Sequence, residues 1–336
     1  MISKKITNPT VAVVGGGSWA TALVKILSEG DTKIKWWVRT KETANYIKTF
    51  QHNPNYLSDV QINSKKVKVD TNIVRVLDNV DYVILCVPSA YLIQTLEPVT
   101  PQMLRGTSVV SAIKGLVPGA NMLVSEYLEQ KYFLSPEDIL CIGGPCHSEE
   151  VAMEKQSFLT VACEDYTNAL KFAQLLNCRF VKTHCLTDIY GVEYSAILKN
   201  IIAIASGIAR GLNYGDNFQA VLVSNAMQEV KRFLDGIKPM QRDINDSAYL
   251  GDLLVTCYSQ FSRNRTFGNM IGRGYTVKSA QVEMNMVAEG YYGCKSIIDL
   301  NKKYEIDIPI CKSVYHILYE KINPTIEFQI LKSILR

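Results

Sequence analysis

Lys199 stands in the middle of an apolar stretch, EYSAILKNIIAIASGIARG, at residues 193–211. A buried ammonium group is costly unless it is paired or has lost its proton, so this lysine must reach solvent or act in chemistry. At 100° per residue, Ser195, Ala196 and Ser206 lie on the lysine's side of a helix, and isoleucines lie opposite. A small-residue face leaves room for a substrate beside the amine. A lysine that snorkels to solvent is the alternative, and spacing alone does not separate the two.

Two later stretches carry groups that could act together with this amine. Asp252 and Thr256 are one helical turn apart in GDLLVTC, and Arg263, Asn264 and Arg265 follow in a loop-like run. A carboxylate can orient an amine, and an Arg/Asn cluster suits a phosphate group. The run SRNR could equally be a solvated basic turn. RNA contact is disfavoured because no aromatic residues are interleaved and the net charge is modest.

A second lysine, Lys114, follows the predicted strand at residues 107–113. It therefore sits at the carboxyl end of that strand, near the crevice where doubly wound sheets bind ligands. The alternative is an ordinary loop lysine.

The stretch VAVVGGGSWATALV contains a glycine-rich turn between a predicted strand and a predicted helix. Gly15, Gly17 and Ala20 fit the pattern G-x-G-x-x-G/A, which is informative here because it directly follows a predicted strand and opens a predicted helix. The first glycine allows a tight turn, the second lets the backbone approach a pyrophosphate, and the third small residue lets helix pack on strand. The free N–H groups at the helix start would face the phosphates, so the motif predicts dinucleotide binding.

The residue at the end of the second predicted strand bears on the choice between NAD and NADP. NAD sites usually place an acidic residue there for the ribose 2′-hydroxyl, about 20 residues after the glycines. The stretch WWVRTKE places Arg39 at this point, with Lys41 nearby and Glu42 only later. Arginine can accommodate a 2′-phosphate, which allows NADP. Arg39 could also lie over the adenine or in solvent, so both NAD and NADP stay open.

Short apolar, β-branched runs alternate with helix-length segments in the first half of the chain, which predicts a parallel, doubly wound α/β sheet. The expected strands are 11–15, 33–38, 81–88, 107–113, 139–145, 158–164 and 180–185. From Asp188 onward the periodicity is helical. The expected helices are 190–211, 217–235, 246–260, 278–302 and 310–321. We therefore expect a dinucleotide-binding domain at 1–187 and an all-α substrate domain at 188–336.

Composition limits the partners and the compartment. The 336 residues are 47% apolar and carry a net charge of +4, which suits a small anionic ligand better than nucleic acid. Nine cysteines show no zinc-like spacing, so no metal site is predicted, and their odd number argues against a disulfide framework. The polar start MISKKITNPT and the lack of an uncharged membrane-length stretch predict a soluble, cytoplasmic protein.

Ordered motifs from about residue 10 to 320 make the chain resemble the NAD(P)-dependent glycerol-3-phosphate dehydrogenases of the bacterial, biosynthetic type. The motifs are GGGSWATAL, CVPSAYL, AIKGL, GGPCHSEEV, LKNIIAIASGIARGL, GDLLVTC, SRNRTFG and VAEGYY. The resemblance implies a Rossmann domain, a helical domain and interconversion of dihydroxyacetone phosphate and sn-glycerol 3-phosphate for phospholipid synthesis. The sequence leaves a homodimer open.

The resemblance also assigns roles to matching residues. It implies that Lys199 donates and accepts the proton and that Asp252 orients the lysine side chain. It also implies that Lys114 touches both cofactor and substrate. The implied substrate contacts are Lys114, Gly144, Cys146, Lys199, Asn200, Asp252, Thr256, Ser262, Arg263 and Asn264. The implied cofactor contacts are Gly15, Gly17, Ser18, Trp19, Arg39, Lys114, Ser148, Arg263, Val287 and Glu289.

The chain departs from the family pattern at three positions. Ala20 replaces the third glycine, Ala90 replaces a histidine, and Cys146 replaces a threonine. Cysteine is a weaker hydrogen-bond donor than threonine, which puts that substrate contact in question. Two other functions stay open: a β-hydroxyacid dehydrogenase, which the SRNR phosphate site disfavours, and a catalytically silent NAD(P)-binding sensor.

Overall fold

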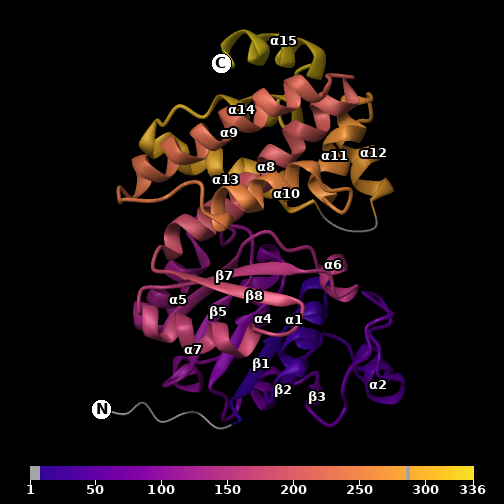
Figure 1. Ribbon diagram of the computed structural model, residues 1–336, viewed down its shortest axis with the longest axis vertical. Coiled ribbons are helices and arrows are strands. Elements are labelled where there is room, and N and C mark those ends of the chain that lie inside the picture. Colours follow the sequence, from indigo (N-terminus) through magenta and orange to yellow (C-terminus); the bar gives the residue numbers. More distant parts are fainter. Residues whose placement is uncertain (1–7, 285–287) are drawn as a thin grey trace. The chain divides into compact units, whose positions relative to one another are not determined.

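The computed structural model describes residues 8–284 and 288–336 (Figure 1). Contacts divide the described chain into two compact units. The sheet unit runs up to Ile113 and resumes at Val124–Ile189, and the helical unit comprises Lys114–Leu123 and Tyr190–Arg336. The boundary suggested by the sequence, between residues 187 and 188, stays a prediction for the two domains.

The sheet unit is built on eight strands in the order β3-β2-β1-β4-β5-β6-β7-β8, which confirms the predicted doubly wound sheet. Neighbouring strands are parallel except for the antiparallel pair β6 and β7. The strands are β1 Thr10–Val14, β2 Lys33–Trp37, β3 Val67–Asp70, β4 Tyr82–Leu85, β5 Ser108–Ser111, β6 Ile139–Gly143, β7 Ser157–Cys163 and β8 Val181–Leu186.

Strand β3 is absent from the strands expected from the sequence. It has only four residues, VKVD, in which one lysine and one aspartate alternate with two valines. Its register is set by the neighbouring strand β2, where Ile34 pairs with Val67 and Trp37 pairs with Asp70. A segment this short depends on its partner strand rather than on its own hydrophobic pattern.

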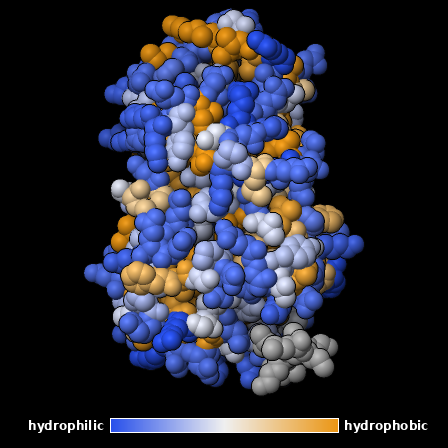
Figure 2. Space-filling view, turned by 90° about the vertical axis from the view of Figure 1, so that its left-hand side faces the viewer, coloured by the Kyte–Doolittle hydropathy of each residue, from blue (hydrophilic) through white to orange (hydrophobic). Residues whose placement is uncertain are grey.

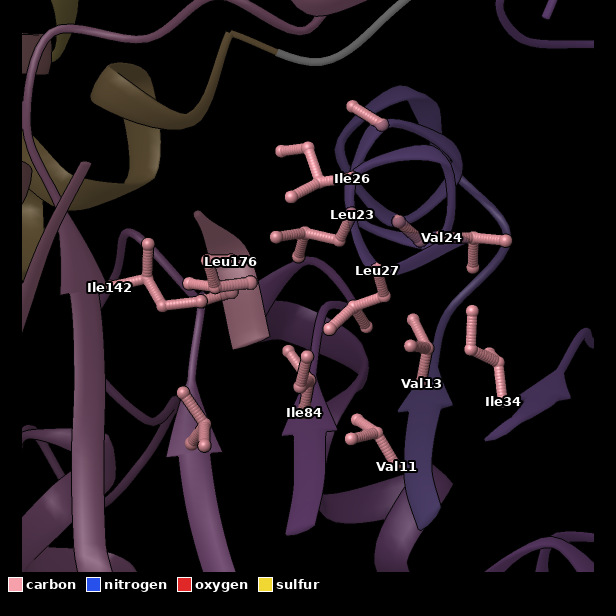
Figure 3. Packing of buried hydrophobic residues seen from close by; sticks show 14 of the residues in the cluster. Val11, Val13, Leu23, Val24, Ile26, Leu27, Ile34, Ile84, Ile142 and Leu176 are labelled. Carbon is pink, nitrogen blue, oxygen red and sulfur yellow. The ribbon is translucent and has the colours of Figure 1, made fainter. Parts of the chain in front are cut away.

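Helices cover the sheet because each buries one apolar face against it. They are α1 Ser18–Glu29, α2 Lys41–Phe50, α3 Ile73–Leu77, α4 Leu92–Leu96, α5 Val124–Tyr132, α6 Ser148–Ala152 and α7 Tyr166–Leu176, with 3-10 turns at Ser89–Tyr91, Pro101–Leu104 and Pro136–Asp138. In Figure 3, Leu27 of α1 points toward Ile84 of β4, and both belong to the buried cluster that also contains Leu23 of α1 and Val13 of β1. All four side chains are buried, so this packing holds the start of α1 over the carboxyl ends of the strands.

The helical unit follows the helical periodicity expected from Asp188 onward. Its helices are α8 Ile189–Gly211, α9 Asp216–Ile237, α10 Asp252–Tyr258, α11 Arg263–Gly272, α12 Val277–Glu283, α13 Glu289–Tyr304, α14 Pro309–Leu318 and α15 Pro324–Ile334, with a π-helical turn at Ser247–Gly251 before α10. By length and apolar composition alone, α8 could cross a bilayer. Every residue of its most apolar window is nevertheless buried inside the protein, as in a core helix.

Two expectations for this unit are wrong. The run SRNR is not a loop: Ser262 is the N-cap of α11, its Oγ accepts the backbone N–H of Arg265, and Arg263 begins the helix. Serine is a favoured N-cap because its side chain satisfies a backbone donor of the first turn. The helix expected at 278–302 is instead two helices, α12 and α13.

Helix α15 leaves an apolar stripe at the surface. Ile326, Ile330 and Ile334, spaced four residues apart, are each at least half exposed, whereas Phe328 and Leu331 on the other side are buried. Figure 2 shows hydrophobic surface over this helix, at the top of the view. Helix α15 is therefore apolar on its outer face as well as its inner one.

Candidate active site

The glycine-rich turn between β1 and α1 has the geometry that the motif predicts. Gly15 has a φ of +140°, and a Cβ on it would lie 2.2 Å from the carbonyl oxygen of Cys86. Both the backbone conformation and the close approach of β4 exclude a side chain here. The backbone N–H of Gly15 donates to the carbonyl of Trp37, 3.1 Å away, which ties the turn to β2.

Two buried side chains that the sequence did not single out hold this turn. The Nε1–H of Trp36 donates to the Gly15 carbonyl at 2.6 Å. Asn53 donates from Nδ2 to the Gly16 carbonyl at 3.0 Å and to Oγ1 of Thr21 at 2.8 Å. A buried asparagine with polar partners fixes the backbone around it. The signal in the sequence was weak, because Asn53 lies 37 residues from the glycine that it contacts.

Gly17 and the start of α1 leave space for an anionic group. A Cβ on Gly17 would meet no protein atom within 4 Å, so no packing inside the chain requires a glycine there. Gly17 is the N-cap of α1, and glycine has no side chain that could accept the N–H groups of the first turn. Such N–H groups bind phosphate, and a dinucleotide pyrophosphate therefore fits this end of the helix.

Four more of the residues predicted on the cofactor side lie in the sheet unit, whereas Lys114, Arg263 and Glu289 lie in the helical unit. Ser18 is buried at the first position of α1, and Trp19 packs on the hydrophobic cluster of this unit. Arg39 is exposed two residues after β2, beside Thr40, which caps α2. Ser148 begins α6 and is buried. Val287 lies outside the described residues.

Gly144 and Cys146, predicted to contact substrate, directly follow β6 in the sheet unit. Gly144 has a φ of +99°, and a Cβ on it would lie 3.1 Å from the backbone of both Phe158 and Thr160. Cys146 is buried and belongs to the hydrophobic cluster of this unit. A cysteine packs in such a cluster as a small apolar residue.

In the helical unit, Lys199 forms an ion pair with Asp252. Lys199 projects from the middle of α8, and Asp252 is the first residue of α10. Both side chains are at most 5% exposed, which rules out the alternative that this lysine snorkels to solvent. The pair predicted from the sequence is thus present, and its charges are removed from water.

Burial sets the protonation behaviour of this amine. Loss of water lowers the pKa of Lys199 to about 8, Asp252 opposes the shift, and the positive charge of Lys114 adds to it. An amine with a pKa of about 8 can both donate and accept a proton near neutral pH.

Three further predicted residues interact electrostatically with the pair or with one another. Lys114 is half-buried, and it acts electrostatically on both Lys199 and Glu289. Burial raises the pKa of Glu289, while Lys114, Arg263 and Lys199 oppose that shift. Three cations and two carboxylates therefore gather in the helical unit, which leaves an excess of positive charge for an anionic ligand.

The remaining predicted substrate residues are buried beside this cluster. Asn264 lies on the first turn of α11, and its Oδ1 accepts the backbone N–H of Gly290 at 2.9 Å. Thr256 donates from Oγ1 to the Asp252 carbonyl at 2.6 Å, which links the hydroxyl to its own helix. The buried residues of this group are Asn200, Asp252, Thr256, Ser262 and Asn264.

One polar atom on the lysine's side of α8 has no partner among the described residues. Ser195 is 4% exposed, and its Oγ forms no hydrogen bond there. It lies one helical turn before Lys199, on the same face. A buried hydroxyl left without a partner is costly unless a bound molecule or water completes it, so its place beside the amine fits a polar ligand. Helical periodicity predicted that this serine lies on the lysine's side of the helix but gave it no partner.

The two units together define a nicotinamide-dependent dehydrogenase: a dinucleotide-binding turn in one unit and a buried lysine–aspartate pair in the other. Two family models narrow the class. The N-terminal model of NAD-dependent glycerol-3-phosphate dehydrogenase matches residues 10–169, and the C-terminal model matches residues 188–329. The chain belongs to this family.

Curated relatives and solved structures agree with the family models. The chain is 32% identical to the NAD(P)+-dependent glycerol-3-phosphate dehydrogenase of Clostridium botulinum over 314 residues, which are 94% of each chain. Its counterpart from Syntrophomonas wolfei is 33% identical, over 93% of this chain and 91% of the relative. The crystal structure of gpsA from Coxiella burnetii matches with a TM-score of 0.90 at 28% identity and covers 96% of this chain and 98% of that one.

A more distant likeness concerns the fold alone. A D-mandelate dehydrogenase matches with a TM-score of 0.59 at 16% identity, over 93% of this chain and 98% of that one. Its similarity extends to the arrangement of elements and does not carry a function to this chain.

Proposed function

We propose that this protein interconverts dihydroxyacetone phosphate and sn-glycerol 3-phosphate with NAD(H) or NADP(H) and thereby supplies glycerol 3-phosphate for phospholipid synthesis. The observation that carries the proposal is the buried Lys199–Asp252 pair, whose amine has a pKa of about 8. The family membership and the names of the relatives support the choice of substrate.

The proton chemistry follows from the environment of Lys199. When bound, the nicotinamide cofactor supplies hydride to the ketone carbon, or accepts it in the reverse direction. Reduction turns the ketone oxygen into an alkoxide, which must be stabilised and protonated. We assign this proton to Nζ of Lys199, and we assign to Asp252 the task of holding the ammonium group in place. In the reverse direction the neutral amine removes the hydroxyl proton.

The phosphate of the substrate is assigned to the start of α11. Arg263 offers a guanidinium and Asn264 an amide, both suited to phosphate oxygens. Contacts at the phosphate, remote from the reacting carbon, supply binding energy that positions the carbonyl. We also assign substrate contacts to Lys114, Asn200, Thr256 and Ser262, and to Gly144 and Cys146 of the sheet unit.

On the cofactor side we assign the pyrophosphate to the turn at Gly15 and Gly17 and to Ser18. Arg39 is exposed and cationic at the end of β2, which favours NADP with its 2′-phosphate. The other cofactor contacts that we infer are Trp19, Lys114, Ser148, Arg263, Val287 and Glu289. We further infer a cytoplasmic location, because the cysteines among the described residues form no disulfide, as expected in a reducing compartment. The homodimer stays a prediction.

The test is a spectrophotometric assay with purified protein, dihydroxyacetone phosphate and, in parallel, NADH or NADPH. We expect oxidation of the cofactor that depends on dihydroxyacetone phosphate, with NADPH favoured. Dihydroxyacetone, which lacks the phosphate, is the matched control substrate and should be turned over far less efficiently. Cofactor binding without turnover would support a silent sensor, and turnover of β-hydroxyacids alone would support the other dehydrogenase class.

A further inference from the structure

The side chain of Asn264 caps a different helix from the one that carries it. Its Oδ1 accepts the backbone N–H of Gly290, the second residue of α13, at 2.9 Å. The N-cap of α13 is Ala288, which has no side-chain oxygen to offer, so the amide of Asn264 takes over that function from α11. Asn264 and Gly290 are both buried, which shields the bond from competing water.

At Gly290, the first turn of α13 lies against both α8 and α11. A Cβ on this residue would lie 2.5 Å from the carbonyl oxygen of Asn200 on α8 and 3.0 Å from Oδ1 of Asn264. The first contact involves backbone, which cannot rotate away as a side chain could. Only glycine therefore lets α13 begin at this distance from α8 and present its N–H to Asn264.

The bond decides which end of the Asn264 amide is left for a ligand. A side-chain amide has one oxygen that accepts and one NH₂ group that donates twice. Because Gly290 occupies the oxygen, the NH₂ group is the end that remains for other partners. Phosphate oxygens accept hydrogen bonds, so the donor end is favourable for a phosphorylated substrate, whereas the oxygen would repel it.

We propose that Gly290 is a positioning residue for the substrate phosphate: it fixes the Asn264 amide with its NH₂ group toward the ligand. The inference rests on the proposed function, in which Asn264 binds phosphate. Its effect should be specific to the phosphate, because Gly290 acts on the ligand through Asn264. A purely structural role would instead affect phosphorylated and unphosphorylated substrates alike.

The first variant is Gly290→Ala, measured as kcat/KM for dihydroxyacetone phosphate and for dihydroxyacetone. We expect the ratio of the two to fall by about 10- to 100-fold, the usual worth of a hydrogen bond to a charged group. Gly293→Ala is the matched control: it lies one turn later on α13, and its Cβ would meet a single side-chain atom, Cγ2 of Ile197 at 3.2 Å, and no backbone atom within 4 Å. The ratio should stay unchanged in that variant. An equal loss with both substrates in Gly290→Ala would overturn the proposal.

A second variant, Asn264→Asp, keeps the test decisive if Gly290→Ala does not fold. The carboxylate can still accept the Gly290 N–H, so the melting temperature should hold, but it has no donor and places negative charge against the phosphate. We expect the substrate ratio to fall by at least about 10-fold. A fall of less than about 3-fold in a folded variant would contradict the assigned amide orientation.

The same measurements separate this inference from the proposed function. Absence of turnover with dihydroxyacetone phosphate in the unmodified protein would refute the function itself. Normal turnover there, with Gly290→Ala behaving like Gly293→Ala, would refute only the positioning role.

Discussion

Burial lowers the pKa of Lys199 to about 8 against the attraction of Asp252, so the rate should follow the protonation of this amine. Reduction of the ketone needs the ammonium form, and oxidation of the alcohol needs the neutral amine. We therefore expect kcat/KM for reduction to be constant below this pKa and to fall above it. For oxidation, kcat/KM should rise through the same pH and then level off, since this parameter reports the free enzyme.

The matched variant for this pH profile is Asp252→Asn, which removes the negative charge that supports the ammonium form. The pKa of Lys199 should fall further, and both pH profiles should shift to lower pH. Profiles recorded between pH 6 and 10 in both directions, with constant ionic strength, provide the measurement. Unshifted profiles in Asp252→Asn would remove Lys199 as the titrating group.

Individual residues differ in how far the sequence could place them. Lys199 was predictable because helical periodicity fixed its face, and Asp252 because its carboxylate suits an amine. The bond between Asn264 and Gly290 joins residues 26 positions apart through a backbone N–H. No side-chain pattern records such a contact, because every non-proline residue carries the same donor.

At the scale of elements, the crossing of α8 and α11 brings α11, which carries Arg263 and Asn264, against the helix of Lys199. A Cβ on Gly207 would lie 2.1 Å from the Arg265 carbonyl oxygen, and one on Gly268 would lie 2.1 Å from that of Ile204. At these two glycines the helices therefore touch backbone to backbone.

Gly268→Ala should destabilise the protein by about 1–3 kcal/mol or more, because the backbone of α8 cannot yield to the added methyl group. Gly215→Ser is the control in the same unit: a Cβ there meets nothing within 4 Å, and serine suits this N-cap position of α9. Thermal and urea unfolding should separate the two variants. Equal stability of Gly268→Ala and the unmodified protein would contradict the close packing of α8 on α11.

Element boundaries could be predicted where the hydrophobic periodicity is strong. The prediction failed where a single local signal sets the start or end of a helix. The long buried strands and α8 follow from continuous apolar runs. The start of α11 depends on the capping oxygen of Ser262, a signal that the charged run SRNR obscured. The separation of α12 from α13 has no glycine or proline to mark it, so the sequence pattern joined them.

At the scale of the whole molecule, the residues that we assign to dinucleotide binding and to proton transfer belong to different parts of the chain. The turn at Gly15 and Gly17 belongs to the sheet unit, whereas Lys199 and Asp252 belong to the helical unit. The sequence showed this division as a change from alternating strands and helices to helices alone. Loss of the proposed proton donor should therefore leave intact the turn to which we assign the cofactor pyrophosphate.

We expect Lys199→Ala to bind NADPH and NADH as the unmodified protein does, while its kcat for reduction falls by about 10²- to 10⁴-fold. The change leaves Asp252 buried without its cation, which costs about 3–5 kcal/mol and could lower the rate by unfolding alone. The double variant Lys199→Ala, Asp252→Asn removes that charge and controls for stability. Fluorescence titration of the cofactor, with turnover measured below the melting temperature, separates binding from chemistry. Near-normal turnover in either variant would refute the assignment of Lys199 as the proton donor, and loss of cofactor binding in the stable double variant would show that the two functions depend on each other.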